Sequence, residues 1–436
     1  MAASMRKMSE PKSFRAHVEV VKRLILDPNV PIPAMAALLI AEILVNVTVI
    51  WRIKYTEIDW VAYMQEVEGV VNGTYDYMQL KGDTGPLVYP AGFVYVFMGL
   101  YYITSFGSNL RLAQYIFMGI YLLNLIVVFD IYRFAKRVPP YVFFFMCALS
   151  YRIHSIYVLR LFNDPVAMLC LYIAVDLFLR GQWAWGCLVF SLGVSIKMNL
   201  LLFAPALLFL LVITQGIKRT VVHLAICALP QILLALPFLL ANPVGYVVRS
   251  FDLGRQFFYI WTVNWRLLPE EIFLSRSFQG LLLLAHILVL FTFFWWRWHK
   301  MFGKIKLQWS NHANLIGMCF SRSLHYQFYV WYFHSLHYLV WCCPYPPVIR
   351  ILVLGLIELC WNTYPSTVAS SAMLHVCHAA LLLGLWLSSP RPGAEISNQQ
   401  SADDRNRESC HDSLHPDQHG KASWQGSPRS QKFKTR

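Results

Sequence analysis

Two carboxylates follow the first long apolar run of the chain and lie two residues apart. Glu57 and Asp59 come directly after the run that ends near residue 50. A carboxylate held near a membrane surface is costly unless it has a partner or a task. One of the two could act as the general base for an acceptor hydroxyl, and the other could orient it or bind a sugar hydroxyl. An ordinary solvated loop acid is the alternative interpretation of each.

The same loop continues into a stretch of turn-forming residues. Residues 80–92 contain glycines and prolines at the mouth of an apolar segment, a pattern typical of a tight turn. Irregular backbone at membrane depth is tolerated where it lines a cavity, so Asp83 in this stretch is a candidate substrate ligand. A plain surface turn is the alternative.

Arginine and aromatic residues alternate in a long loop at 241–276. Its arginines are Arg249, Arg255 and Arg266, and Trp265 is among its aromatic residues. Planar guanidinium groups match phosphate oxygens, and aromatic rings suit an isoprenoid tail or a sugar face. These four residues are therefore candidates for binding a phosphate-bearing lipid. An interfacial aromatic belt with snorkelling arginines is the alternative.

A second polar and aromatic group interrupts the apolar pattern at 322–334. His325 and His334 could bind a phosphate or carry a proton, and Tyr326 and Lys197 add further polar groups between apolar segments. The two histidines lack the spacing of helical metal ligands, and no phosphate-binding glycine loop stands out. We therefore predict neither a metal nor a cofactor.

Together these residues supply an acid, several cations and many aromatic rings, which suits sugar transfer from a phosphate-linked lipid. A transporter of lipid-linked sugars is an alternative, although transporters usually place polar groups deep inside spans or in paired broken helices. A non-catalytic subunit of a glycan-assembly complex is another.

The elements that must position these residues are apolar segments. Of the 436 residues, 57% are hydrophobic and 14% are charged, whereas about 25% are charged in a typical soluble domain. The apolar runs approach the length of about 20 residues that crosses a membrane. The sequence predicts an all-α polytopic membrane protein with roughly 11–12 spans. The candidate spans are 33–50, 112–131, 141–158, 165–179, 183–196, 199–215, 220–240, 277–298, 313–325, 333–346, 348–363 and 368–388.

The net charge of +14 is explained by this topology and not by nucleic-acid binding, because the basic residues cluster in short loops that the positive-inside rule places in the cytosol. That assignment holds if the apolar segment 88–105 does not cross the membrane, and it reverses if the segment does. We adopt the first arrangement. It places 51–111, 159–164, 197–199, 241–276, 326–332 and 364–367 in the lumen.

Three regions follow from these patterns. Residues 1–32 form a cytosolic N-terminal segment, residues 33–388 the transmembrane catalytic domain, and residues 389–436 a disordered cytosolic tail without apolar periodicity. Most of the ten cysteines lie within apolar segments and show no paired spacing, so neither a disulfide framework nor a zinc site is indicated.

Five stretches closely resemble one family of membrane glycosyltransferases. They are 55–60 (YTEIDW), 82–90 (GDTGPLVYP), 160–165 (RLFNDP), 262–271 (TVNWRLLPEE) and 323–335 (SLHYQFYVWYFHS). The family is that of the endoplasmic-reticulum mannosyltransferases that add the first mannose from dolichyl-phosphate-mannose to the lipid-linked oligosaccharide. The resemblance runs from about residue 30 to residue 385.

This resemblance implies a GT-C type bundle with a catalytic first luminal loop and an inverting reaction. Mannose would pass from dolichyl-phosphate-mannose in α1,3 linkage to Man5GlcNAc2 on dolichyl diphosphate, in the endoplasmic-reticulum membrane during N-glycan precursor assembly. It implies that no metal is needed, and the position of the motif makes Asp59 the base. A sister transferase that uses another lipid-linked sugar is the nearest alternative. The segment after about residue 389 does not resemble the family.

Overall fold

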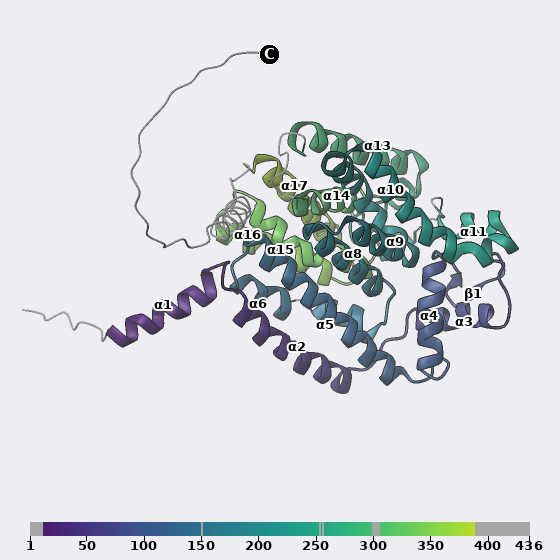
Figure 1. Cartoon of the computed structure of the whole chain (residues 1–436), viewed down its shortest axis with the longest axis horizontal. Helices are drawn as coiled ribbons and strands as arrows, with labels where there is room; N and C mark the ends of the chain where they lie inside the picture. Colours follow the sequence, from purple (N-terminus) through teal and green to yellow (C-terminus); the bar gives the residue numbers. More distant parts are fainter. Residues whose placement is uncertain (1–11, 150, 253, 255–256, 299–305, 389–436) are drawn as a thin grey trace, which may run out of the picture. The chain divides into compact units, whose positions relative to one another are not determined.

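The computed structural model describes residues 12–149, 151–252, 254, 257–298 and 306–388, and most of the described backbone is helical (Figure 1). The predicted tail, 389–436, lies outside the described residues. The longer helices in the first half are α1 (Lys12–Leu26), α2 (Ile32–Arg52), α3 (Trp60–Val71), α4 (Ala91–Ile103), α5 (Leu110–Ala135), α6 (Tyr141–Ala148), α8 (Asp164–Leu179) and α9 (Trp183–Ile196). Those in the second half are α10 (Ala204–Ala241), α11 (Pro243–Ser250), α13 (Arg276–Thr292), α14 (Lys306–Cys319), α15 (Phe333–Cys342), α16 (Pro347–Asn362) and α17 (Val368–Leu387).

Short elements fill the breaks between these helices. They are α7 (Tyr151–His154), the π-helical η1 (Ser155–Leu159), the 3₁₀ turns η2 (Met198–Phe203), η3 (Tyr259–Trp261) and η6 (Tyr326–Trp331), α12 (Glu270–Leu274) and the π-helical η4 (Phe293–Trp298). Within the described ranges, the strands are β1 (Lys81–Gly82) and β2 (Gly85–Pro86), which pair as a small hairpin. The prediction of an all-α polytopic membrane protein is confirmed.

By length and composition, five helical stretches in the described part of the chain are long and apolar enough to cross a membrane. They are Ile32–Arg52, Leu110–Ala135, Met198–Ala241, Arg276–Trp298 and Val368–Leu387, and the bent pair Tyr141–Ala148 and Tyr151–Leu159 would make a sixth. The remaining predicted spans correspond to shorter helices. The total of 11–12 spans therefore stays a prediction.

The contacts of α2 with α5 bear on whether 88–105 crosses the membrane. Arg111, at the start of α5, donates a hydrogen bond to the carbonyl oxygen of Ile50 near the end of α2. Trp51 Nε1 also donates to the hydroxyl of Tyr115 at 2.7 Å. The end of α2 and the start of α5 therefore lie at the same level, so the segment between them, including α4, enters and leaves on one side.

The chain reverses direction within α10. Gly216 has φ 73° and ψ 166°, a left-handed conformation that glycine adopts without strain. The residues just before and just after the helical stretch Met198–Ala241 both contact the predicted luminal loops. Lys197 bonds Asp164 at 2.6 Å, and Asn242 bonds Asp76 at 3.0 Å. The predicted spans 199–215 and 220–240 are thus two helical segments joined at Gly216.

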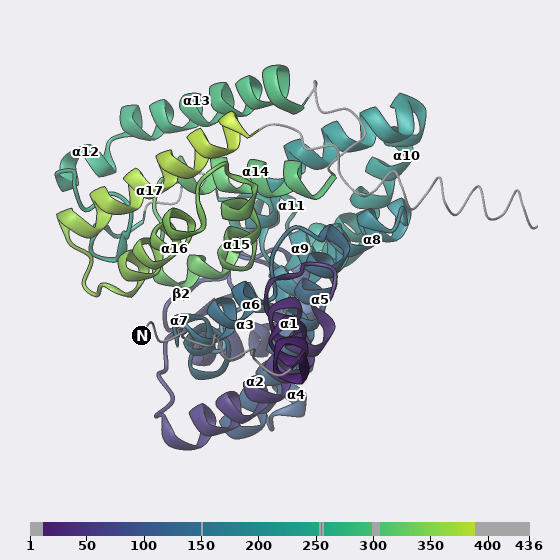
Figure 2. The same ribbon diagram turned by 90° about the vertical axis from the view of Figure 1, so that its left-hand side faces the viewer.

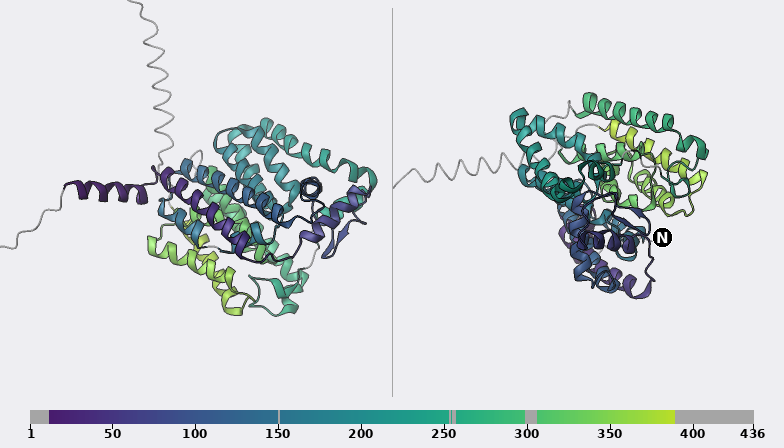
Figure 3. Two further views of the ribbon diagram at one scale, coloured as in Figure 1. Left: turned by 90° about the horizontal axis from the view of Figure 1, so that it is seen from below. Right: turned by 90° about the vertical axis from the view of Figure 1, so that its right-hand side faces the viewer.

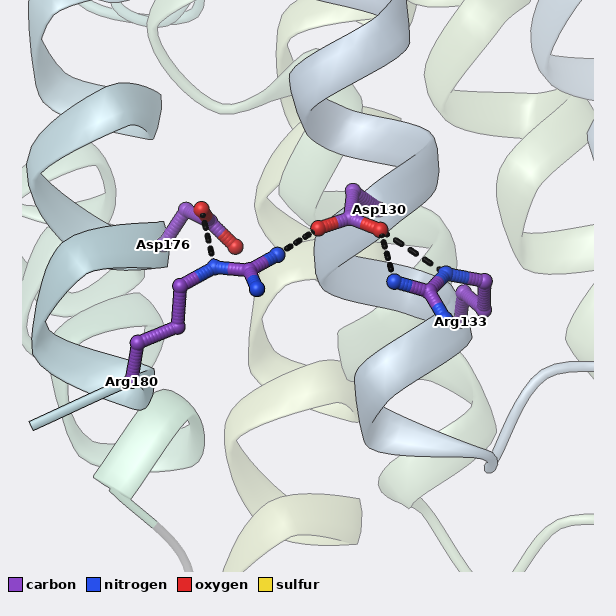
Figure 4. A network of polar contacts seen from close by, with 4 residues as sticks. All are labelled: Asp130, Arg133, Asp176 and Arg180. Atoms are coloured by element: carbon purple, nitrogen blue, oxygen red, sulfur yellow. Dashed lines mark hydrogen bonds and ion pairs between the residues drawn. The ribbon is translucent and has the colours of Figure 1, made fainter.

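Charged residues tie the helices together at the opposite end of the bundle. Arg180, which follows α8, bonds Asp176 at 2.7 Å and also reaches Asp130 of α5, and Arg133 bonds the same Asp130 at 2.8 Å (Figure 4). Arg137 donates to the backbone oxygen of Trp341 at 3.4 Å at the end of α15. Arg133, Arg137 and Arg180 therefore lie together at this end.

The bundle has two sides that meet around the candidate site. In Figures 2 and 3 the elements α2 to α6 (purple to blue) and α13 to α17 (green to yellow) occupy different parts of the bundle. Close packing holds the first predicted luminal loop in place. A Cβ on Gly82 would lie 2.6 Å from the Cα of Ala62, and one on Gly92 would lie 2.0 Å from the Oγ of Ser195. Glycine at these two positions lets the β1–β2 hairpin sit on α3 and α4 sit on α9.

Candidate active site

A cavity of about 1650 Å³ opens where the predicted luminal loops meet. Its wall combines the face of α2, the loop before α3, the β1–β2 hairpin, the end of η1, the start of η2, the segment after α11, and η6. Its polar lining includes Lys54, Asp59, Tyr63, Glu66, Tyr89, Arg152, Arg160, Lys197, Asn199, Arg249, Asp252, Arg322, His325, Tyr326 and Gln327. The loops predicted to share one side of the membrane thus enclose one common space.

The candidate residues divide into those that line this cavity and those that do not. The lining includes Asp59, Lys197, Arg249, His325 and Tyr326. The candidates outside the lining are Glu57, Asp83, Trp265, Arg266 and His334. Arg255 lies outside the described residues.

Asp59 is placed by the helix that follows it. It is the residue before α3, and the first residue of that helix, Trp60, is 1% exposed and donates from Nε1 to the backbone oxygen of Gly107 at 3.0 Å. One turn later the hydroxyl of Tyr63 lies 3.2 Å from Asp59 Oδ2. These anchors hold the half-buried carboxylate at the edge of the cavity.

Tyr63 is a hydrogen-bond donor to Asp59. Its ring is 2% exposed and packs edge-on against Phe97, with ring centroids 4.8 Å apart. Burial, followed by the nearby Tyr89 hydroxyl and the carboxylate of Asp59, raises the pKa of Tyr63 well above its usual value. The phenol therefore keeps its proton, and donation of that proton stabilises the carboxylate form of Asp59.

A chain of polar contacts continues from Tyr63 to the far wall. The Tyr63 hydroxyl lies 3.5 Å from Asn163 Oδ1, which accepts a bond from Lys197 Nζ at 2.8 Å. The same ammonium lies 2.6 Å from Asp164 Oδ2, and the Asp164 carboxylate also accepts a bond from the indole of Trp331. The charge of Lys197 is therefore paired in a buried ion pair, and this pair links α8, α9 and η6.

Glu57 stabilises the start of α3. Its Oε1 accepts a bond from the backbone N–H of Val61 at 3.1 Å, and its Oε2 accepts one from the Tyr55 hydroxyl at 2.8 Å. Burial and the Glu57 carboxylate raise the pKa of Tyr55. An exposed acid beside the N-terminus of a helix satisfies otherwise unpaired N–H groups and favours the helix dipole. Of the two acids, the geometry therefore favours Asp59 as the base.

The candidates outside the cavity have packing contacts of their own. Arg266 lies over the ring of Tyr259, 4.3 Å from its centroid, and donates to the backbone oxygen of Tyr259 at 3.3 Å. Trp265 donates to the backbone oxygen of Ser321 at 2.8 Å and packs on His375. These contacts fold the 257–268 segment against its neighbours.

His334 and Asp83 are also held away from the cavity. His334 is 1% exposed within α15, where its ring lies edge-on to Tyr172. Asp83 is exposed in the turn of the hairpin, and its backbone N–H donates to Gln65 Oε1 at 2.7 Å. The first is packed in the helical core and the second fixes the hairpin on α3.

Two arginines that were not candidates, Arg152 and Arg160, line the cavity, together with Arg322 from the polar group at 322–334. Burial lowers the pKa of the Arg322 guanidinium, and the carboxylate of Asp252 partly offsets that effect. A sequence signal for Arg152 and Arg160 existed, because an arginine inside or at the end of an apolar span is costly unless it has a role. Arg152 was passed over as part of the predicted span 141–158, and Arg160 as part of the predicted luminal segment 159–164.

No group of three or more His, Cys, Asp and Glu side chains that could hold a metal ion occurs among the residues that the structure describes. The positive charge of the cavity wall comes from guanidinium and ammonium groups. A carboxylate with a fixed hydrogen-bond donor, facing several arginines in a partly buried space, can remove a proton from a hydroxyl while cations stabilise a departing phosphate.

Comparison with known proteins agrees with this chemistry. The family model described as ALG3 protein matches residues 36–371. A human protein named Dol-P-Man:Man(5)GlcNAc(2)-PP-Dol alpha-1,3-mannosyltransferase is 56% identical over 396 residues, which cover 85% of this chain and 90% of the relative. The mouse protein of the same name is 53% identical over 423 residues, covering 89% and 97%, and that of Arabidopsis thaliana is 44% identical over 389 residues, covering 82% and 88%.

No solved structure shows a significant match to this chain. The family match nevertheless spans the segments that build the cavity, from α2 to the start of α17. Several relatives are similar over more than four fifths of the chain. The chain therefore belongs to the ALG3 protein family.

Proposed function

We infer that this chain is the α1,3-mannosyltransferase that its relatives are named for, using dolichyl-phosphate-mannose as donor and Man5GlcNAc2 on dolichyl diphosphate as acceptor. The observation that carries this proposal is the position of Asp59 at the edge of a cavity of about 1650 Å³ whose wall also holds several arginines. Such a volume suits a bulky saccharide together with a lipid phosphate.

The proposed reaction is a single inverting displacement. A hydroxyl of the acceptor mannose attacks the anomeric carbon of the donor, and Asp59 accepts its proton. The bond between that carbon and the phosphate oxygen breaks, and the electron pair leaves with dolichyl phosphate. Cationic side chains of the cavity stabilise the charge that develops there, and no metal or cofactor is required.

The reaction is proposed to take place on the luminal side of the endoplasmic-reticulum membrane. The end of the bundle that carries Arg133, Arg137 and Arg180 is opposite the cavity, and the positive-inside rule assigns such an end to the cytosol. Asn72, an exposed residue in an Asn-Gly-Thr sequon, lies in a loop on the same side as the cavity. Glycosylation at such sequons takes place in the lumen, which supports a luminal position for this side.

Purified protein in detergent, supplied with dolichyl-phosphate-mannose and the lipid-linked pentamannosyl acceptor, tests the proposal. We expect a product larger by one hexose, with the new mannose in α1,3 linkage as judged by mass and linkage analysis. An unchanged acceptor, or a mannose in another linkage, would refute it. An acceptor that already carries the α1,3 mannose is the matched control and should not be extended.

A further inference from the structure

Two arginines, Arg152 and Arg160, lie on one wall of the cavity and donate hydrogen bonds to neutral groups. Arg152 is 9% exposed, donates from Nε to Asn362 Oδ1 at 3.1 Å and lies 4.6 Å from the centroid of the Tyr326 ring. Arg160 is half-buried and donates to the hydroxyl of Ser155. Among the residues that the structure describes, neither forms an ion pair with a carboxylate. Both guanidinium groups are therefore held by neutral partners.

The carboxylate of Glu358 acts electrostatically on Arg152, but in the described part of the chain the two groups form no ion pair. Asn362 separates Arg152 from Glu358, because the Asn362 amide donates to Glu358 Oε1 at 2.5 Å while its oxygen accepts from Arg152. Burial, and then the positive charge of Arg152, lowers the pKa of Arg160. Placing two cations that repel each other in a partly desolvated wall costs free energy, and a bound anion offsets that cost. A phosphate is a suitable anion because its oxygens match paired guanidinium groups.

An apolar surface continues from these arginines along α2. The apolar lining positions on α2 and just after it are Leu38, Ala41, Val45, Val49 and Ile53, and the charged ones are Glu42 and Lys54. The apolar positions repeat at intervals of three and four and therefore share one face of the helix. They extend over about 22 Å along the helix axis at 1.5 Å per residue. Phe144, Ala148 and Leu149 of α6 and its end, together with Ile156, line the same cavity. This surface suits a hydrocarbon chain.

The charges that line the cavity indicate how a lipid would lie in it. In the middle of α2, the carboxyl group of Glu42 is 2% exposed and bonds His154 at 2.7 Å. A phosphate would be repelled by that carboxylate and attracted by Arg152 and Arg160. The phosphate end therefore belongs at the arginines, with the chain running along α2.

The position of Arg160 indicates which lipid binds. The backbone N–H of Thr56 donates to the carbonyl oxygen of Leu159 at 3.1 Å, which joins the residue before Arg160 to the segment that carries Asp59. In the donor the phosphate is bonded directly to the carbon that is attacked, whereas in the acceptor several sugars separate the diphosphate from the accepting mannose. A phosphate site next to the base segment therefore fits the donor.

We propose that Arg152 and Arg160 bind the phosphate of the lipid donor, with its polyprenyl chain against the apolar face of α2 and α6. The proposal rests on the proposed function. The two guanidinium groups bind the phosphate diester before the reaction. When the bond to the sugar breaks, they stabilise the additional negative charge on the departing phosphate. Dolichyl phosphate, the product, should then be a competitive inhibitor that uses the same two arginines.

Steady-state kinetics on the purified protein test this proposal by varying the donor and the acceptor separately. We expect Arg152→Gln and Arg160→Gln to raise the donor KM and the inhibition constant of dolichyl phosphate about 10- to 100-fold, the range expected for a lost charge-assisted hydrogen bond. The acceptor KM should stay within about twofold. Arg152→Lys and Arg160→Lys, which keep the charge but not the planar fork, should fall between wild type and the glutamine variants.

The outcomes separate the two proposals. Arg180→Ala, an exposed arginine at the opposite end (Figure 4), is the matched control and should leave both KM values unchanged. If the wild-type protein transfers mannose and the four variants keep the wild-type donor KM, or raise the acceptor KM instead, the assignment of Arg152 and Arg160 is wrong. If the wild-type protein transfers no mannose, the proposed function itself fails. Should a glutamine variant not fold, the corresponding lysine variant gives the decisive comparison.

Discussion

The hydroxyl of Tyr63 lies 3.2 Å from Asp59 Oδ2 and 3.5 Å from Asn163 Oδ1. This phenol therefore stands between the proposed base and the buried pair of Lys197 and Asp164. Three separate parts of the chain, the start of α3, the start of α8 and the end of α9, are fixed relative to one another through it. Tyr63 is a positioning residue for Asp59.

Removal of the Tyr63 hydroxyl should slow the chemical step without disturbing the fold. Tyr63→Phe keeps the ring that packs on Phe93 and Phe97, so we expect the variant to fold. The loss of a hydrogen bond to a charged group is worth about 1.5–3 kcal/mol, which corresponds to a fall in kcat of roughly 10- to 100-fold. Both KM values should change little. A variant with wild-type kcat would remove Tyr63 from this role.

The buried ion pair of Lys197 should matter for stability far more than an exposed one. Lys197→Met leaves the carboxylate of Asp164, which is 0% exposed, without its cation, and such a loss costs about 3–5 kcal/mol. Arg180→Ala breaks pairs whose arginine side chain is 41% exposed, where each pair is worth about 0–1 kcal/mol. Unfolding of both variants in detergent measures the difference.

The double variant Lys197→Met with Asp164→Asn is the control for that comparison. It removes the uncompensated charge and should recover part of the lost stability. Equal destabilisation by Lys197→Met and Arg180→Ala would contradict the account of Lys197 as a structural cation. That result would instead favour the substrate-binding role that the sequence predicts for Lys197.

The topology can be tested by labelling single cysteines in sealed microsomes with a membrane-impermeant reagent. Lys81 in the β1–β2 hairpin and Lys136 after α5 are both exposed and lie at opposite ends of the bundle. We expect Lys136→Cys to react in sealed vesicles and Lys81→Cys to react only after permeabilisation. Replacement of Cys410 by Ser removes background from the tail. The reverse pattern would place the cavity in the cytosol.

The positions of the helices could be predicted because an apolar run is a local property of the sequence. The predicted spans 33–50, 112–131 and 368–388 correspond to α2 (Ile32–Arg52), α5 (Leu110–Ala135) and α17 (Val368–Leu387). The status of 88–105 could not be decided in this way. It depends on contacts between distant residues, such as that of Trp51 with Tyr115, which no local pattern reveals.

The site was predictable in its location and less so in its members. Asp59, Arg249 and His325 line the cavity as expected, because each lies in a loop that the topology brings to that side. Whether a side chain of such a loop faces the cavity depends on the contacts that it makes with neighbouring residues. The guanidinium group of Arg266 stacks on the ring of Tyr259 and therefore does not line the cavity.

The residues that sequence reasoning missed share a different feature. Arg152 lies inside the predicted span 141–158 and Arg160 two residues after it, and an arginine in either place is readily explained as snorkelling toward the membrane surface. Only the three-dimensional structure shows that these two side chains line the cavity, where Arg152 contacts Asn362 of α16 and Tyr326 of η6.

The most direct test of the central claim is the mannosyl-transfer rate of Asp59→Asn, with Glu57→Gln as its matched control. Asparagine keeps the size of the side chain but cannot accept the proton, so we expect the rate to fall by at least about 10²-fold. Glu57→Gln retains an oxygen that can accept the Val61 N–H and should stay within a few-fold of wild type. Full transfer by purified Asp59→Asn protein would contradict the account.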